Sequence, residues 1–81
     1  MYVILDARKL GTKETAHPYL KHVFGFPDYY GHNLDALYDC LSEVPQIHFL
    51  LIHVQEAGDY FSKVLSVFEE LLDAQIRYIE P

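Results

Sequence analysis

Three carboxylates stand four residues apart in the middle of the chain, at Asp35, Asp39 and Glu43. In a helix this spacing places all three on one face, where they could accept charge-assisted hydrogen bonds from a cationic partner. Like charges at this spacing destabilise a helix by roughly 0.2–0.5 kcal/mol per pair. The helix dipole favours Asp35 in the first turn but not Glu43 at the other end. The acid stripe (Asp35, Asp39 and Glu43) is either a solvated polar face, the commoner case for an acidic stripe alone, or a binding surface. The lack of a balancing cation, the tyrosine on the same helix and the tyrosine loop before it favour the binding surface.

The same region offers little to an enzyme. Acid–base catalysis would use His32 with Asp35 and Asp39. The chain has no activated nucleophile and no glycine-rich loop that could hold a phosphate. We expect Cys40, which follows Asp39 in the helix, to be a partly buried structural thiol. The sequence therefore predicts a protein that is not an enzyme.

The five histidines do not form a metal-binding pattern. His17 and His22 are five residues apart, as are His48 and His53, and this spacing places neither pair on one face of a helix or a strand. We expect His48 and His53 to flank a strand, and His17, His22 and His32 to occupy surface or cap positions. No metal and no cofactor are predicted.

A short helix over residues 34–43 must carry the acids. Leu34, Leu37 and Leu41 form its apolar stripe, Asn33 is its expected N-cap, and Pro45 ends it. The acids lie away from the leucines on this helix, so they are expected to face outward.

Aromatic side chains accompany the acids. Tyr38 and Ser42 point away from the leucine stripe, so Tyr38 is expected to be exposed among the acids. Tyr29 and Tyr30 precede the helix, and one of the two is expected in the core. Gly31 supplies a positive φ, permits a close approach to the helix start, or is a plain turn residue. Aromatics beside sparse polar groups are typical of protein interfaces.

The remaining elements predict an α/β fold. Tyr2–Leu5 is a short apolar strand, expected to be buried on both faces. Further along we expect a helix capped by Thr15 with Pro18 in its first turn and Gly25 at its end, a strand within 47–54, a helix over 61–74 begun by Asp59, and a strand over 76–79. The order β-α-α-β-α-β predicts two layers, a three-stranded parallel sheet with helices packed on it.

Composition sets the class of protein. The chain has 81 residues, of which 51% are hydrophobic, and this predicts one packed domain over residues 1–81. No apolar run approaches the ~18–20 residues of a membrane span, and no secretory signal opens the chain. A single cysteine fits a reducing compartment, so we expect a cytoplasmic location.

Charge narrows the choice of partner. Twelve acids against six lysines and arginines give a net charge of −6, which argues against nucleic acid or an anionic membrane surface as partner. Between His22 and Ser62 there is no lysine or arginine. The acid stripe thus has no cation placed to balance it. We expect its field to attract a basic protein.

The stretch Pro27–Leu41, PDYYGHNLDALYDCL, closely resembles the central motif of the barstar family, intracellular inhibitors of the barnase-type secreted ribonucleases. The family pattern is proline, an acid, Tyr-Tyr-Gly, any residue, then Asn-Leu-Asp-Ala-Leu, an aromatic, Asp and a following Leu. Val64–Glu70 also resembles the last helix of the family, and the predicted order of elements matches its fold. The resemblance implies a small two-layer barstar-like fold with no chemistry of its own.

The resemblance also implies a mechanism, in which the helix and loop plug the active site of a basic, extracellular-type ribonuclease one-to-one. Asp39 would occupy the pocket for the substrate's phosphate, Asp35 would face the basic rim, and Tyr29 would pack over the catalytic cleft. Glu70 matches an acid on the last helix that reaches the same enzyme. The implied partner-binding residues are Tyr29, Tyr30, Gly31, Asn33, Leu34, Asp35, Tyr38, Asp39, Ser42, Glu43 and Glu70.

A second interpretation stays open, a barstar-like interaction module whose partner is a different toxin or a protein other than a ribonuclease. Tyr38 stands where the family usually has tryptophan, and Glu43 adds a charge beside it. Both departures bear on the identity of the partner. In either case the free protein is expected to be a monomer.

Overall fold

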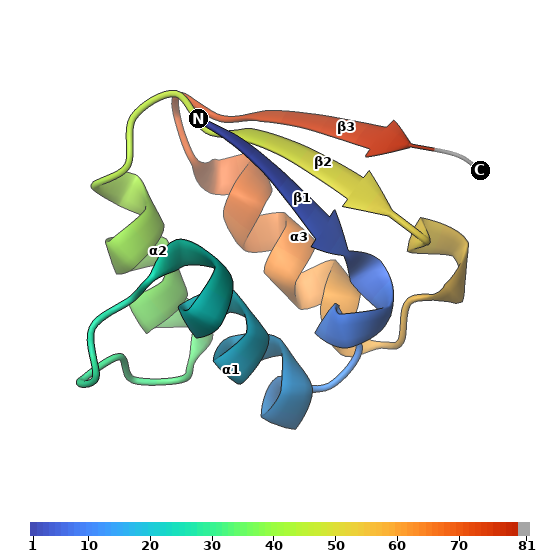
Figure 1. Ribbon diagram of the computed structural model, residues 1–81, viewed down its shortest axis with the longest axis horizontal. Coiled ribbons are helices and arrows are strands. Elements are labelled where there is room, and N and C mark those ends of the chain that lie inside the picture. The colour runs from blue at the N-terminus through green and yellow to red at the C-terminus, as the bar shows by residue number, and fades with distance from the viewer. Residues whose placement is uncertain (80–81) are drawn as a thin grey trace.

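The computed structural model describes residues 1–79 and shows a parallel sheet with helices packed on one face (Figure 1). In chain order the elements are β1 (Tyr2–Asp6), a 3₁₀ turn (Ala7–Leu10), α1 (Lys13–Phe24), α2 (Leu34–Ser42), β2 (His48–Ile52), a second 3₁₀ turn (Val54–Glu56), α3 (Tyr60–Glu70) and β3 (Gln75–Ile79). The predicted fold class and order β-α-α-β-α-β are confirmed. Within residues 1–79, no helix is both long enough and apolar enough to cross a membrane.

The sheet is covered on one side only. β2 lies in the centre and pairs in parallel with β1 and β3. Val3 and Leu5 face the helices and are buried, whereas Tyr2 and Ile4 on the other side are 72% and 62% exposed. The expectation that the first strand is buried on both faces is therefore wrong. All three α-helices lie on the same side of the sheet (Figure 1), so side chains of β1 and β2 alternate between buried and more exposed positions. In β3 every side chain except that of Ile76 is exposed.

Aromatic stacking fills the space between the sheet and the helices. Phe49 of β2 and Phe68 of α3 are fully buried, and their ring centroids lie 4.0 Å apart in a stacked arrangement. Phe24, from the end of α1, packs edge-on against Phe49 at 6.3 Å. The central strand thus holds the first and last helices to one core.

α1 begins one turn earlier than predicted. Thr12, not Thr15, is its N-cap, because the Thr12 hydroxyl accepts a hydrogen bond from the Thr15 backbone N–H. Pro18 consequently lies inside the helix, where it leaves one carbonyl of the preceding turn without its usual partner. Gly25 ends the helix as expected, with φ 68 in the left-handed region that a residue with a side chain rarely adopts.

α3 also differs at its ends from the helix predicted over residues 61–74. It stops at Glu70 rather than near Ala74, because Leu71 turns to an extended backbone with ψ 129. The next residues lead into β3, whose first backbone N–H, at Gln75, bonds the carbonyl of Ile47. Asp59 precedes the helix, but its side chain makes no capping hydrogen bond. The terminal strand is confirmed, one residue longer than predicted.

Phe49→Ala should lower the free energy of unfolding by about 3–5 kcal/mol, because it leaves a cavity where the Phe49 ring stacked on Phe68 and met the edge of Phe24. The matched control is Ile4→Ala on the open face of the neighbouring strand, which should cost no more than about 1 kcal/mol. Urea unfolding followed by circular dichroism measures both. Equal losses for the two variants would contradict the one-sided core.

Candidate functional site: an acidic groove between two helices

The loop before α2 is fixed by local contacts at the helix start. Asn33 caps α2 as predicted, its Oδ1 accepting a hydrogen bond from the Ala36 N–H at 2.8 Å. A Cβ on Gly31 would lie 3.1 Å from the Asn33 amide nitrogen and 3.3 Å from the Ala36 Cβ. Gly31 therefore permits a close approach, and the positive φ falls on His32 instead, at 53°. The glycine lets the loop lie tightly against the helix it precedes.

α2 turns its acids outward. Leu37 and Leu41 are fully buried, while Asp35, Asp39 and Glu43 are exposed. Glu43 is the C-cap residue and lies just beyond the last helical residue, Ser42. The Ser42 hydroxyl donates to the Asp39 backbone carbonyl at 2.8 Å, so it helps close the last turn. The outward acid stripe is thus present as the spacing predicts.

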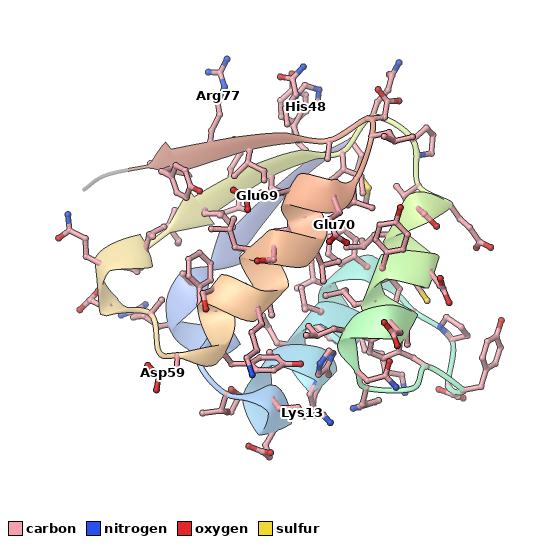
Figure 2. All side chains as sticks on the ribbon, turned by 180° about the vertical axis from the view of Figure 1, so that it is seen from behind. Lys13, His48, Asp59, Glu69, Glu70 and Arg77 are labelled. Atoms are coloured by element: carbon pink, nitrogen blue, oxygen red, sulfur yellow. The ribbon has the colours of Figure 1, made fainter. Side chains whose placement is uncertain are left out.

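A groove runs between α2 and α3, with a volume of about 670 Å³. From α3 comes Glu70, which Figure 2 shows on the side of that helix nearest α2. The fold therefore joins an acid of the last helix to two members of the acid stripe. The groove is lined by Leu34, Asp35, Tyr38, Asp39, Lys63, Ser66, Val67 and Glu70.

The groove between α2 and α3 also contains a cation, which comes from outside the stretch His22–Ser62 that has no lysine or arginine. Lys63 of α3 lines the groove with Asp35 and Asp39. Lys13 of α1 joins Lys63 in an adjoining depression beside Asp35 and Tyr60. The expectation that no cation is placed near the acid stripe is therefore wrong. The sequence pattern did not place either lysine near the acid stripe, because both are distant from it in the chain. Packing of α1 and α3 brings them to the start of α2.

Ser42 and Glu43 belong to a neighbouring surface. They line a second depression of about 340 Å³ at the end of α2, together with Tyr38 and apolar side chains of the turn after α3. Tyr38 borders both hollows and is half-buried against the core. This corrects the expectation that Tyr38 is exposed, since part of its side chain packs against the core.

The tyrosine pair is divided between surface and core. Tyr29 is 88% exposed, whereas Tyr30 is 5% exposed. One of the pair is in the core, as predicted, and it is Tyr30. Its buried ring packs against Phe26 and presents little surface to any partner. We therefore interpret Tyr30 as a residue that positions the loop, rather than as the direct contact that the sequence implied.

His17 is the polar residue that sequence reasoning missed. It is 1% exposed, so its expected surface or cap position is wrong. Its Nδ1 bonds the Tyr30 hydroxyl and its Nε2 bonds the Tyr60 hydroxyl, each at 2.7 Å. A neutral imidazole donates through one nitrogen and accepts through the other, so both bonds fit a neutral ring. The spacing of His17 with Leu20 and Phe24, at i+3 and i+7, was the available signal.

These bonds tie the loop before α2 to both other helices. His17 comes from α1, Tyr30 from the loop, and Tyr60 from the first turn of α3. Burial lowers the pKa of the His17 imidazole, and electrostatic interaction with the nearby His32 and Lys13 side chains lowers it further. Burial also raises the pKa of both tyrosine hydroxyls. The cluster is therefore neutral near pH 7 and holds the loop by hydrogen bonds rather than by charge.

The residues of the enzyme interpretation are not joined by any hydrogen bond within residues 1–79. The His32 ring lies beside Tyr30, with ring centroids 5.2 Å apart, and Asp35 and Asp39 face the groove. Burial raises the pKa of the half-buried Cys40 thiol, which stays protonated near neutral pH. Within the described chain no three histidine, cysteine or acidic side chains are grouped so that they could hold a metal ion.

Comparison with known proteins gives a family for this geometry. The family model described as "Barstar (barnase inhibitor)" matches residues 1–78, from β1 into β3. The chain belongs to the barstar family. A Bacillus subtilis (strain 168) protein named "Putative ribonuclease inhibitor YrdF" is 38% identical over 74 residues, which cover 84% of this chain and 81% of that protein. The family match therefore spans all three α-helices of the described chain and reaches into β3, and it includes both walls of the groove.

The histidine cluster predicts how this barstar-family protein responds to acid. The folded-state pKa of His17 lies below its ordinary value of about 6.5, so the unfolded chain binds the proton more readily. The contribution of His17 to the free energy of unfolding should be complete above about pH 6.5 and should be lost as the pH falls below that value.

Urea unfolding at several pH values between about 7.5 and 5 measures this dependence. His17→Gln should be less stable at the upper end and should lose less stability on acidification than the wild type. His22→Gln, which removes an exposed histidine of the same helix, should keep the wild-type slope. Parallel slopes for all three proteins would exclude His17 as the titrating group.

Proposed function

We propose that this protein inhibits a basic ribonuclease by binding one-to-one across the enzyme's active site. Membership in a family described as barnase inhibitors supports this role, as does a relative named as a ribonuclease inhibitor. The observation that carries the proposal is the groove, where Asp35 and Asp39 of α2 meet Glu70 of α3. Three carboxylates on one open surface fit a site built to bind a polyanion, because such a site is cationic.

Asp39 is the phosphate mimic in this proposal. It is exposed in the middle of the groove wall, and the described chain offers it no ion pair of its own. Arginine and histidine side chains of a ribonuclease would donate charge-assisted hydrogen bonds to its oxygens. Asp35 and Glu70 would face the rim of the enzyme's cleft. The carboxylates of the inhibitor would thus take the place of RNA phosphates in the active site. They stand on a helix, which a ribonuclease cannot cleave.

The loop supplies the apolar part of the contact. Tyr29 projects into solvent at 88% exposure, while its neighbour Tyr30 is fixed by His17. A large exposed ring on an anchored backbone loses little conformational freedom on binding. Tyr29 would pack over the catalytic cleft, with Gly31 and Asn33 shaping the loop and Leu34 beside it. Tyr38, Ser42 and Glu43 would extend the contact toward the end of α2.

A second candidate is a barstar-like module that binds a different toxin or another basic protein. Lys63 beside Asp35 favours keeping this candidate, because a lysine in the groove reduces its attraction for a uniformly cationic site. The two candidates share the same surface. They differ in whether RNA cleavage stops when the partner is bound.

Titration against a panel of small basic microbial ribonucleases tests the proposal. RNA cleavage should fall with a one-to-one stoichiometry, and the inhibition should be competitive with substrate. If no enzyme of the panel is inhibited, the ribonuclease claim fails and the interaction module remains. A pull-down followed by mass spectrometry would then identify the partner.

Asp39→Ala should weaken inhibition by about 2 kcal/mol or more, because it leaves the enzyme's cations without a partner in the complex. Glu56→Ala is the matched control, since it also removes one exposed carboxylate. Glu56 pairs with His53 in the turn after β2, at the other end of the molecule from α2 (Figure 1). Inhibition constants for the two variants measure the difference. A loss for Glu56→Ala as large as that for Asp39→Ala would contradict the assigned role.

Association with the ribonuclease should slow as salt rises from about 50 mM to about 500 mM, because ions screen attraction between separated charges. Stopped-flow measurement of the association rate at several salt concentrations tests this. The dissociation rate, which depends on contacts already formed, should change much less. An association rate that does not respond to salt would contradict electrostatic steering.

A further inference from the structure

Lys63 occupies one end of the acidic groove. It shares a face of α3 with Val67 and Glu70, four and seven residues further on. Seven residues span about 10 Å along a helix. Lys63 and Glu70 therefore stand at opposite ends of the wall that α3 contributes.

The lysine end of the groove is the start of α2. The depression that adjoins the groove there is lined by Lys63, Lys13, Asn33 and Asp35. At the other end Glu70 is followed by Leu71, which lines the second depression with Ser42. The two helices thus run in the same direction along the groove. Their N-termini lie together at the lysine end, and this adds positive partial charge there.

The charge of the binding surface is therefore divided rather than uniform. Two lysines and two helix N-termini lie at one end, where Asp35 is the carboxylate among the residues that line the adjoining depression. Glu14, one residue after Lys13, lies near Tyr60 of that depression. Asp39 and Glu70 lie toward the other end. Lys63 is exposed and takes part in none of the ion pairs within residues 1–79. Its ammonium group is consequently available to a partner.

We propose that Lys63 is a specificity-determining residue, which selects a ribonuclease that places a carboxylate, not a further cation, opposite the start of α2. This inference rests on the proposed function and names the kind of enzyme that the surface fits. A ribonuclease with cations all around its cleft meets like charge at Lys63 and binds more weakly. An enzyme with an acid at that edge forms an ion pair there, while its central cations bind Asp39.

The test is a charge reversal with a matched control. Lys63→Glu places an acid in the first turns of α3, where the helix dipole favours it, so the fold should hold. Arg77→Glu makes the same change in net charge on the open face of the sheet. Figure 2 shows Arg77 standing away from the helices. Urea unfolding should give the two variants similar stability.

Inhibition constants are measured for both variants against the ribonuclease panel. Lys63→Glu should weaken inhibition of the enzyme that the wild type inhibits best by about tenfold or more. It should strengthen inhibition of the most basic, weakly inhibited enzymes by a similar factor. Arg77→Glu should shift all enzymes slightly and in one direction. If Lys63→Glu also shifts every enzyme in one direction, Lys63 does not determine specificity.

A second measurement separates this inference from the proposed function. Hexa-arginine peptide is titrated into each protein, and amide shifts of α2 are followed by NMR. Lys63→Glu should bind the peptide at least several-fold more tightly than Arg77→Glu, with shifts at residues 33–39. Equal affinity would overturn the charge assignment even if ribonucleases are inhibited. If no enzyme of the panel is inhibited, the proposed function and the ribonuclease specificity fail together, and the peptide result still decides whether Lys63 repels cations at this end of the groove.

Discussion

The position of the candidate binding surface depends on one buried imidazole. His17 joins three segments through two hydrogen bonds of 2.7 Å, one to the loop before α2 and one to the first turn of α3. A buried imidazole without partners would be costly, and so would the buried Tyr30 hydroxyl without one. The three groups satisfy one another, and no buried side-chain polar atom of the described residues is left without a partner. The position of Tyr30, and with it the exposed neighbour Tyr29, follows from this cluster.

The cluster of His17, Tyr30 and Tyr60 holds the loop without using charge, so the acids of α2 are not needed for this purpose. The acids of α2 do not hold the fold together, since none of them takes part in an ion pair within residues 1–79. They can face solvent because Leu37 and Leu41 supply the packing on the other side of the helix. Packing and the proposed recognition thus belong to opposite faces of α2. Like charges along one face cost some helix stability, and that cost is what binding to a cationic partner would relieve.

Local sequence patterns were enough to predict α2, the helix that carries the acid stripe. The Asn33 cap and the leucine stripe involve residues within one or two turns of each other, so their spacing predicts α2 closely. Signals of equal strength caused errors elsewhere. Thr12 and Thr15 are both good caps, and the pattern alone does not choose between them. The apolar pattern of α3 runs on past Glu70, but pairing of Gln75 with the central strand ends the helix earlier.

By itself, the sequence determined the order of elements, the family motif, the outward face of the acid stripe and the presence of one core tyrosine. Tertiary structure alone decided which tyrosine is buried, because the partner of Tyr30 lies 13 residues away and the other partner of His17 lies 43 residues away. It also decided that only one face of the sheet is covered, and that Lys63 lies beside the acids of α2. The place of Glu70 beside them was implied by the family resemblance and not by any local pattern. Helix and cap patterns report contacts within a few residues. The charge of the groove depends on contacts between segments far apart in the chain, and no local pattern records them.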